Sequence, residues 1–319
     1  MAEISVIIPC YNVSNYIGRC LKALENQTFK DFSVILVDDC STDNTLEVLE
    51  DYKKNTPLSI EIIKNEQNSG PAASRNRGIL AAKTEYIAFC DGDDWYDDVF
   101  LGGMISLIKQ NNADLSLCGY KVVDNCKVTS TRPIVDSDCV MDFKKALTLE
   151  SDSLCMLVVK SEIMKNTLLP DLRNGEDVAV VPLLMSKAKS IAVTKECYYN
   201  YYRRSGSASQ KPNEKVVNSL LWAYGYLKSN FPSGNEAELE FLGIKNMLYP
   251  SLISLFSYSY NTKKADEILN NFESENRNWA HNAHLKSLPS YKRIVLKCAE
   301  FRWYLFIRLI AGLRNKLTN

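Results

Sequence analysis

The chain has 319 residues, enough for one large α/β domain with a helical extension. Its 38 lysines and arginines balance 38 aspartates and glutamates, so it lacks the basic excess of a general nucleic-acid-binding protein. Two histidines, and ten cysteines without a Cys-x-x-Cys pair, disfavour a zinc site, and no run reaches the roughly 18 apolar residues of a membrane span.

The first hundred residues predict alternating strands and helices. Ile4–Ile8 and Val34–Val37 are apolar, β-branched runs, which are typical of parallel strands buried on both faces. The spacing of apolar residues and the turn signals extend this alternation: we expect further strands at 58–63 and 85–90, and helices at 16–24, 43–52 and 71–82. The pattern predicts the βαβαβαβ half of a doubly wound, mostly parallel sheet.

The later part of the chain is less regular. We expect a helix near 99–110, a strand at 114–119, hairpins and loops at 121–140 that shape a substrate pocket, a helix after the acids of 174–177, and a strand at 198–204. Beyond Pro212 the sequence is mainly helical. We therefore predict an α/β domain at residues 1–210 and a helical region at residues 211–319.

The predicted fourth strand runs directly into five carboxylates within eight residues, beginning Asp91-Gly92-Asp93-Asp94. Crowded carboxylates stay ionised together only if water or a cation spreads their charge, and Mg²⁺ or Mn²⁺ prefers such oxygen ligands. A solvated acidic turn is the alternative. The position at the carboxyl end of a strand favours a metal whose remaining ligands are substrate phosphates.

Several nucleotide-binding motifs are absent. The first strand-to-helix turn reads Pro9-Cys10-Tyr11-Asn12, without the spaced glycines of NAD or FAD sites, and no Gly-Lys-Ser/Thr follows a strand. An EF-hand starting at Asp91 fails because Trp95 and Tyr96 occupy its fifth and sixth positions. A nucleotide sugar suits the remaining pattern: Asp39 can accept from the imide of uracil, Arg75 can face a base or phosphate, and Asp91 and Asp93 can hold ribose and metal.

Four segments, in order, resemble the motifs of bacterial family 2 glycosyltransferases: 7–12, 37–45, 68–78 and 91–94. The resemblance is close over residues 4–98 and extends to Arg204. It implies a GT-A fold, a nucleotide-sugar donor and an inverting mechanism. One departure is Cys40, which stands where a glycine is more usual and which we interpret as a tolerated small residue.

The resemblance assigns roles by position. Asp93, with Asp91, would bind the metal, and Asp177 would be the general base, with Glu176 the second candidate. The residues expected to contact the nucleotide sugar are Pro9, Tyr11, Asn12, Asp39, Arg75, Asp91, Gly92, Asp94, Arg203, Arg204 and Ser207. The last three would close over the diphosphate, although a solvated strand end accounts for them equally well.

The leading hypothesis is a metal-dependent glycosyltransferase that moves a sugar, from UDP as the expected carrier, to a glycan or lipid-linked acceptor in cell-surface polysaccharide synthesis. A sugar-phosphate nucleotidyltransferase would need a Gly-rich first turn with a catalytic Lys or Arg, which residues 9–12 lack. A non-catalytic nucleotide-sugar-binding subunit could dispense with the base, and the intact Glu176-Asp177 pair disfavours it. Nucleic acid is not an expected partner.

The C-terminal tail is strongly basic. From Lys286 onward eight basic residues face one acid, so the tail carries +7 and the preceding 285 residues −7. Drawn as one helix, 290–317 places most cations on one side and most apolar residues on the other. We expect either packing on the domain or peripheral membrane association. Scattered cysteines and no signal-peptide pattern predict a cytoplasmic protein, at the inner face of the cell membrane if the tail binds lipid.

Overall fold

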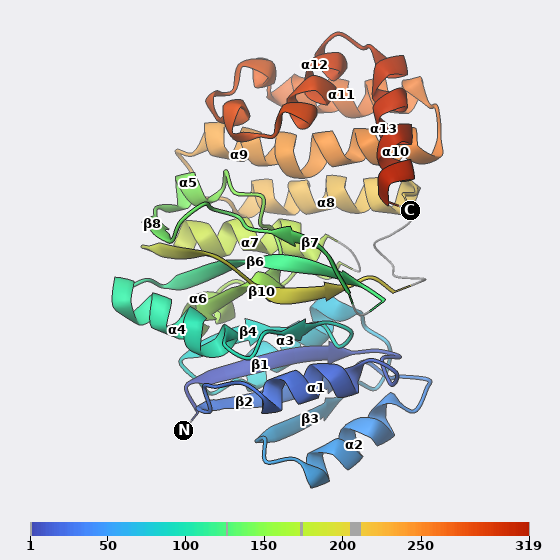
Figure 1. Ribbon diagram of the computed structural model, residues 1–319. Helices are drawn as coiled ribbons and strands as arrows, with labels where there is room; N and C mark the ends of the chain where they lie inside the picture. The colour runs from blue at the N-terminus through green and yellow to red at the C-terminus, as the bar shows by residue number, and fades with distance from the viewer. Residues whose placement is uncertain (1, 126, 173–174, 205–211, 319) are drawn as a thin grey trace. The chain divides into compact units, whose positions relative to one another are not determined.

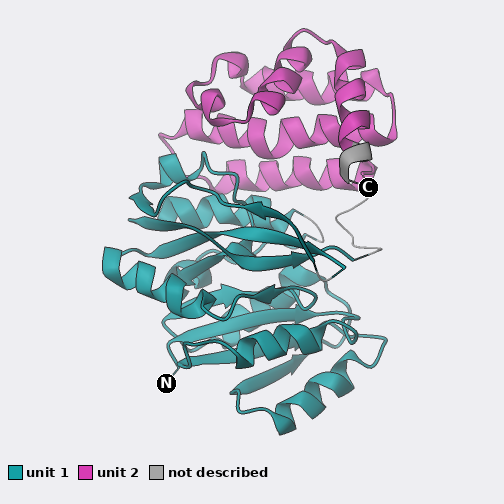
Figure 2. Cartoon of the chain, in the orientation of Figure 1, with its two compact units in different colours: residues 1–205 teal, residues 206–319 magenta. Residues whose placement is uncertain are grey.

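The computed structural model describes residues 2–125, 127–172, 175–204 and 212–318. The chain divides into two compact units, residues 1–205 and 206–319 (Figure 2). The domain boundary that we expected at residue 210 falls in a segment outside the described residues.

Unit 1 is built on one 10-stranded sheet (Figure 1). Along the main path the strand order is β3-β2-β1-β4-β9-β6-β10-β5, with β7 paired to β6 and β8 paired to β10. The strands are β1 (Ile4–Cys10), β2 (Phe32–Asp38), β3 (Ile60–Lys64), β4 (Tyr86–Phe89), β5 (Trp95–Tyr96), β6 (Leu115–Asp124), β7 (Lys127–Arg132), β8 (Cys139–Met141), β9 (Leu157–Lys160) and β10 (Ile191–Tyr202). Strands β1 to β4 pair in parallel, whereas β9 is antiparallel to both β4 and β6. The predicted α/β class with a mostly parallel N-terminal sheet is confirmed.

The helices of unit 1 connect and cover these strands: α1 (Ile17–Glu25), α2 (Thr45–Asn55), α3 (Pro71–Ala81), α4 (Phe100–Asn111), α5 (Phe143–Ala146), α6 (Ser161–Lys165) and α7 (Glu176–Lys187), with a 3₁₀ turn at Leu154–Met156. Helix α3 packs on β1 and β2, and α4 packs on β6 and β10. A Cβ on Gly78 of α3 would lie 2.4 Å from Cγ2 of Ile7, so glycine is required for this close helix-to-strand approach.

The central strands are apolar and buried on both faces, as expected for strands covered by helices. Because β3, β2, β1 and β4 are parallel neighbours, their carboxyl ends lie at one edge of the sheet. This edge brings together the turns that follow these four strands. The irregular segment after residue 120 forms a hairpin, since β7 pairs antiparallel with the end of β6.

Unit 2 is helical and has its own hydrophobic core (Figure 2). It contains α8 (Glu214–Asn230), α9 (Glu236–Leu242), a π-helical segment (Gly243–Leu248), α10 (Tyr249–Tyr258), α11 (Thr262–Glu275), 3₁₀ turns at Trp279–His281 and Ala283–Ser287, α12 (Ser290–Glu300) and α13 (Tyr304–Thr318). Among the described residues, no helix combines the length and apolarity needed to cross a membrane.

The tail is two helices, so the single helix drawn from the sequence is wrong. Arg302 has a φ of 57°, which breaks the helix between Glu300 and Tyr304. Its guanidinium pairs with Glu273 at 2.7 Å, and this contact holds the break in place. Both helices bury apolar side chains in the core of unit 2, among them Val295 of α12 and Ile307 of α13.

Candidate active site

Arg75 lies at the centre of a group of acids at the carboxyl edge of the sheet. It extends from α3 and is 4% exposed. Its Nη2 is 2.7 Å from Oδ1 of Asp91, after β4, and its Nη1 is 2.8 Å from Oε1 of Glu176, at the start of α7. Burial opposes the charge of Arg75, but the carboxylates, first Asp91 and then Asp177, outweigh it and raise the pKa of the guanidinium. We call Arg75, Asp91, Asp93, Glu176 and Asp177 the acidic cluster.

Asp177 has the strongest features of a general base. Its Oδ2 accepts a hydrogen bond of 3.2 Å from the backbone N–H of Leu154, and its buried Oδ1 has no hydrogen-bond partner among the described residues. Burial raises its pKa to about 7; Arg75 opposes this shift and Glu176 adds to it. A carboxylate with a free oxygen and a pKa near 7 suits proton abstraction at neutral pH. Glu176, which is 8% exposed and ion-paired to Arg75, is less available for that role.

Asp91 and Asp93 flank Gly92 in the turn after β4. Each makes an ion pair through one oxygen: Asp91 with Arg75, and Asp93 through Oδ2 with Nε of Arg204 at 2.8 Å. Burial raises the pKa of Asp93, and the charge of Asp91 adds to this shift while Arg204 opposes it. The two carboxylates thus repel each other, and a further cation close to them would relieve that repulsion.

The donor set fits Mg²⁺ or Mn²⁺ in part. Both ions prefer carboxylate oxygens, and each of Asp91 and Asp93 has an oxygen that its ion pair does not use. Within the described part of the chain, no group of three or more His, Cys, Asp or Glu side chains forms a complete metal site. The pair therefore matches the kind of magnesium site that depends on substrate phosphates for its remaining ligands.

Asp94, which we expected to contact the nucleotide, has both carboxylate oxygens hydrogen-bonded within the protein. It is 2% exposed, its Oδ2 accepts a 2.5 Å hydrogen bond from the hydroxyl of Tyr199, and its Oδ1 accepts a 2.7 Å bond from the N–H of Tyr202. Burial, followed by the charges of Asp91 and Asp93, raises its pKa. Both oxygens are directed to β10, so Asp94 anchors the turn to that strand.

Asp39 lies in the turn after β2, residues 38–45, which we call the β2 turn. It is 3% exposed, and its Oδ1 accepts hydrogen bonds from Nδ2 of Asn65 at 2.6 Å and from the N–H of Ser69 at 2.9 Å. Its Oδ2 accepts a 2.7 Å bond from the N–H of Gly70, whose φ of 88° turns the chain into α3. Because a carboxylate oxygen has two lone pairs, Oδ2 retains one for a ligand N–H.

Two residues with left-handed backbone shape this edge. Asn12, with a φ of 51°, accepts through Oδ1 a 2.9 Å hydrogen bond from the N–H of Thr42, which joins the β1 and β2 turns. Cys40 is exposed and has a φ of 58°, which accounts for the usual glycine at this position. The property that matters at this position is therefore the backbone conformation of Cys40 and not the small size of its side chain.

The other predicted contacts vary in position. Pro9 lies near the end of β1 and Tyr11 directly follows that strand, at the same edge, where Tyr11 is 43% exposed. A Cβ on Gly92 would lie 3.1 Å from Val13, so Gly92 allows its turn to approach the start of α1. Arg203 is exposed and binds Val123 through its backbone N–H. Ser207 lies outside the described residues.

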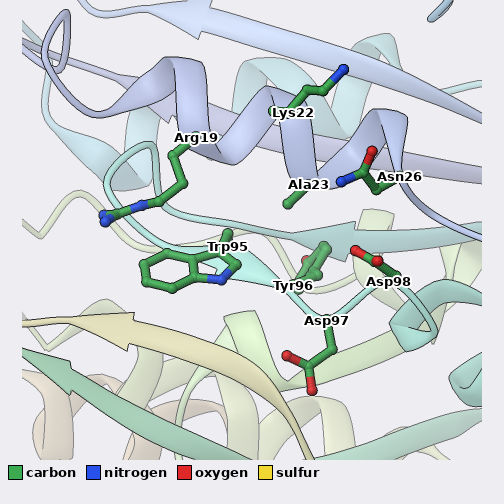
Figure 3. A pocket seen from close by; sticks show the side chains of 8 residues that line it. All are labelled: Arg19, Lys22, Ala23, Asn26, Trp95, Tyr96, Asp97 and Asp98. Carbon is green, nitrogen blue, oxygen red and sulfur yellow. The ribbon is translucent and has the colours of Figure 1, made fainter. Parts of the chain in front are cut away.

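Arg19 of α1 is a site residue that the sequence analysis missed. Its Nη2 donates a 2.8 Å hydrogen bond to the backbone oxygen of Asp93, and its guanidinium carbon lies 3.9 Å from the ring centre of Trp95 and 4.1 Å from that of Tyr202. Figure 3 shows Arg19 reaching from α1 beside Trp95. The pocket drawn there, of about 500 Å³, is lined by residues of α1 and of 95–98. Arg19 thus holds the turn that carries Asp91 and Asp93, through contacts that local sequence does not encode.

Comparisons with known proteins show what this chain is similar to. Residues 5–156 match the family model described as Glycosyl transferase family 2. A poly(ribitol-phosphate) beta-glucosyltransferase of Bacillus spizizenii is 34% identical over 229 residues, 68% of this chain and 36% of that protein. The poly(ribitol-phosphate) beta-N-acetylglucosaminyltransferase TarS of Staphylococcus aureus is 30% identical over 221 residues, 65% of this chain and 36% of TarS. The chain thus spans about a third of the length of these relatives.

The fold has a counterpart among solved structures. A crystal structure of S. aureus TarS 1–349 in complex with UDP-GlcNAc aligns with a TM-score of 0.66 and 22% identity, over 99% of this chain and 92% of that one. The shared fold therefore extends beyond the residues that the family model matches, and the family motifs lie in the parallel part of the sheet. The part of the chain from residue 5 to residue 156 belongs to glycosyl transferase family 2.

Proposed function

We propose that this protein is an inverting glycosyltransferase that transfers a sugar from a UDP-sugar to a hydroxyl of a glycan or lipid-linked acceptor in cell-surface polysaccharide synthesis. Residues 1–210 would form the donor-binding and catalytic domain, and residues 211–319 the helical region. The names of the relatives and the UDP-GlcNAc in the TarS structure support the donor and acceptor classes. The observation that carries the proposal is Asp177, with a free oxygen and a pKa of about 7, next to the Arg75 and Asp91 pair.

The donor would bind across the carboxyl edge of the sheet. Pro9 and Tyr11 would flank the base, and Oδ2 of Asp39 would accept its imide N–H, because Asn65 and Ser69 already occupy Oδ1. These two hydrogen bonds fix the Asp39 carboxylate, and with it the acceptor oxygen Oδ2, before the ligand binds. A buried, preorganised acceptor discriminates against a base without a donor at that position.

The diphosphate would lie over Asp91 and Asp93. These two residues would hold Mg²⁺ or Mn²⁺, which when bound supplies positive charge to the leaving diphosphate. Arg204 is already 2.8 Å from Asp93, so its guanidinium is available on the same side of the turn. Arg19 and Asp94 keep the turn in position from the protein side.

The acceptor hydroxyl would lose its proton to Oδ1 of Asp177. The oxygen of that hydroxyl would then attack the anomeric carbon from the face opposite the diphosphate, which inverts the configuration. The charge of Arg75 stabilises the ionised form of Asp177 and is shared with Glu176 and Asp91. General-base catalysis of this kind contributes about 10²–10⁴-fold to turnover.

Titration of UDP in the presence and absence of Mn²⁺ tests the donor site. We expect metal-dependent binding to the unchanged chain and its loss in Asp93→Ala, whereas the control Asp98→Ala, at an exposed carboxylate of the same run, binds normally. Equal UDP affinity in the Asp93 and Asp98 variants contradicts the metal assignment. Metal-dependent UDP binding without sugar transfer or donor hydrolysis would instead indicate a non-catalytic subunit.

A further inference from the structure

Helix α13 and the residues that precede it expose an unusual amount of apolar surface. Six large apolar side chains are 51–64% exposed: Phe301, Trp303, Leu305, Phe306, Leu309 and Leu313. We call these six residues the apolar strip. Single exposed apolar residues are normal on a protein surface, so the question is whether the six form one patch.

The strip is continuous. The ring centres of Phe301 and Trp303 are 5.4 Å apart, and those of Trp303 and Phe306 are 6.0 Å apart. Leu305, Leu309 and Leu313 follow at intervals of four residues, which places them next to one another along one side of the helix. Aromatic rings therefore lead directly into a line of leucines.

The strip is not the face by which α13 packs on its own unit. Tyr304, Ile307 and Ala311 perform that function, with exposed fractions of 7% or less, in the core of unit 2. On a helical wheel they lie opposite Leu309. Helix α13 is thus apolar on two faces, and packing within unit 2 accounts for only one of them.

Positive charge borders the strip. Arg308 and Arg314 are exposed and fall on the two flanks between its outward and inward faces. Within unit 2 Arg308 contacts Tyr260 and Arg314 contacts Tyr249, and these contacts to tyrosines leave the two charges in place. No aspartate or glutamate occurs after Glu300. Arg302 is paired with Glu273 and Lys297 with Glu300, so neither adds to this border.

We propose that the apolar strip docks unit 2 on an anionic lipid bilayer, with the aromatic and leucine side chains at the level of the head groups and the arginines against the lipid phosphates. Trp, Phe and Leu bordered by Lys and Arg form the composition of helices that lie in a membrane interface. The absence of acids from the strip's own segment matches an anionic surface better than a protein partner with charges of both signs. The strip belongs to unit 2 alone, so lipid docking is independent of the donor site.

Vesicle co-sedimentation of the full chain tests the lipid-docking proposal. We expect binding to phosphatidylcholine vesicles that contain phosphatidylglycerol, weak binding to phosphatidylcholine alone, and release as salt shortens the screening length from about 10 Å at 0.1 M to about 3 Å at 1 M. The double variant Phe306→Glu/Leu309→Glu should lower the affinity by roughly tenfold or more, because it places two anions inside the strip. Equal affinity in the variant, or equal binding to neutral vesicles, overturns the proposal.

Two controls separate lipid docking from unfolding and from self-association. Val128→Glu changes a side chain that is 56% exposed in β7, and it should leave vesicle binding unchanged. Both variants should keep the thermal unfolding temperature of the unchanged chain, since every substituted side chain is exposed. If light scattering without lipid shows a dimer that the double variant abolishes, and no vesicle binds, the strip joins two copies of the chain and lipid docking is wrong.

Discussion

The β2 turn and the acidic cluster lie at the same edge of one sheet, yet their carboxylates differ in hydrogen bonding and in the direction of their pKa shifts. In the β2 turn Asp39 accepts three hydrogen bonds from the protein. Asp43 accepts from Thr45 and Ser14, and these bonds outweigh burial and lower its pKa. In the acidic cluster the pKa values of Asp93 and Asp177 are raised by burial and by neighbouring carboxylates.

The two regions differ in how many hydrogen-bond donors the protein provides for each carboxylate. Backbone N–H groups at the start of α3 and in the β2 turn donate to Asp39 and Asp43, so these two carboxylates are hydrogen-bonded within the protein before a ligand binds. The four carboxylates of the acidic cluster have two arginines near them, Arg75 within the cluster and Arg204 beside it, and Oδ1 of Asp177 has no hydrogen-bond partner among the described residues. This asymmetry is expected if the β2 turn binds the donor and the acidic cluster carries out the reaction, because perturbed pKa values gather where the chemistry takes place.

The largest effect that we predict is on turnover in Asp177→Asn. The amide keeps an oxygen that can accept from Leu154 N–H but loses basicity, so kcat should fall by about 10²–10⁴-fold with little change in donor affinity. The unchanged enzyme should lose activity tenfold per pH unit below about pH 7, because the base must be ionised. Rates of sugar transfer from pH 5 to 9 measure both.

Stability provides the control for that experiment. The folded-state pKa of Asp177 lies above its unfolded value of 3.8, so its favourable contribution is complete below about pH 4 and is lost as pH rises through 7. Asp177→Asn should therefore be no less stable than the unchanged chain at pH 8. Glu176→Gln should reduce kcat less than Asp177→Asn does; the reverse order would transfer the role of base to Glu176.

The second-largest effect that we predict is on the free energy of unfolding. Arg75→Met removes the charge shared by Asp91 and Glu176, and breaking a buried ion pair costs about 3–5 kcal/mol of the free energy of unfolding. We expect the lower end of that range, because the Asp91 side chain is 40% exposed and keeps some solvation. Denaturant unfolding should show a smaller loss at pH 5 than at pH 8, since the orphaned carboxylates then take up protons. The control Lys22→Met, at an exposed pair with Glu25, should change stability by less than about 0.5 kcal/mol.

Much of this edge could be predicted from the sequence. Apolar runs at Ile4–Ile8 and Val34–Val37 identified parallel strands, and their carboxyl ends carry the acids that local motifs singled out. These features are local: strand burial, turn residues and the order of motifs along the chain. The same reasoning identified Arg75 and the start of α7 before their contact was known.

Long-range partners could not be predicted in this way. Asp94 belongs to the same acidic run as Asp93, and only the pairing of β5 with β10 places Tyr199 and the Tyr202 N–H at its oxygens. Asn65, directly after β3, and Arg19, in α1, bind residues of the site without a motif of their own. The break in the tail at Arg302 also depends on a distant partner, Glu273.

A smaller effect tests whether the hydrogen bonds from Ser69 and Gly70 keep Asp39 in position without Asn65. Asn65→Ala removes one donor from Oδ1 of Asp39 and also the hydrogen bonds of Asn65 with Ser74 and Arg77, and a hydrogen bond to a charged group contributes about 1.5–3 kcal/mol to stability. Because Ser69 and Gly70 still bind Asp39, UDP affinity should fall only modestly while the free energy of unfolding falls by at least that amount. If UDP binding is lost and stability is unchanged, Asn65 contacts the ligand directly and does not position Asp39.

The smallest effect is a gain in stability in Cys40→Gly. A non-glycine residue in the left-handed region costs roughly 1–2 kcal/mol, and the larger unfolded-state entropy of glycine offsets about 0.5–1 kcal/mol of that difference, so the net gain should be at most about 1.5 kcal/mol. The exposed thiol makes no buried contact that the substitution would remove. Cys40→Ala, which retains the Cβ, should show no such gain in denaturant unfolding. If alanine and glycine stabilise equally, the backbone strain at Cys40 is negligible, and the β2 turn tolerates its φ of 58° because the hydrogen bonds of Asn12 and Asp43 already fix its shape.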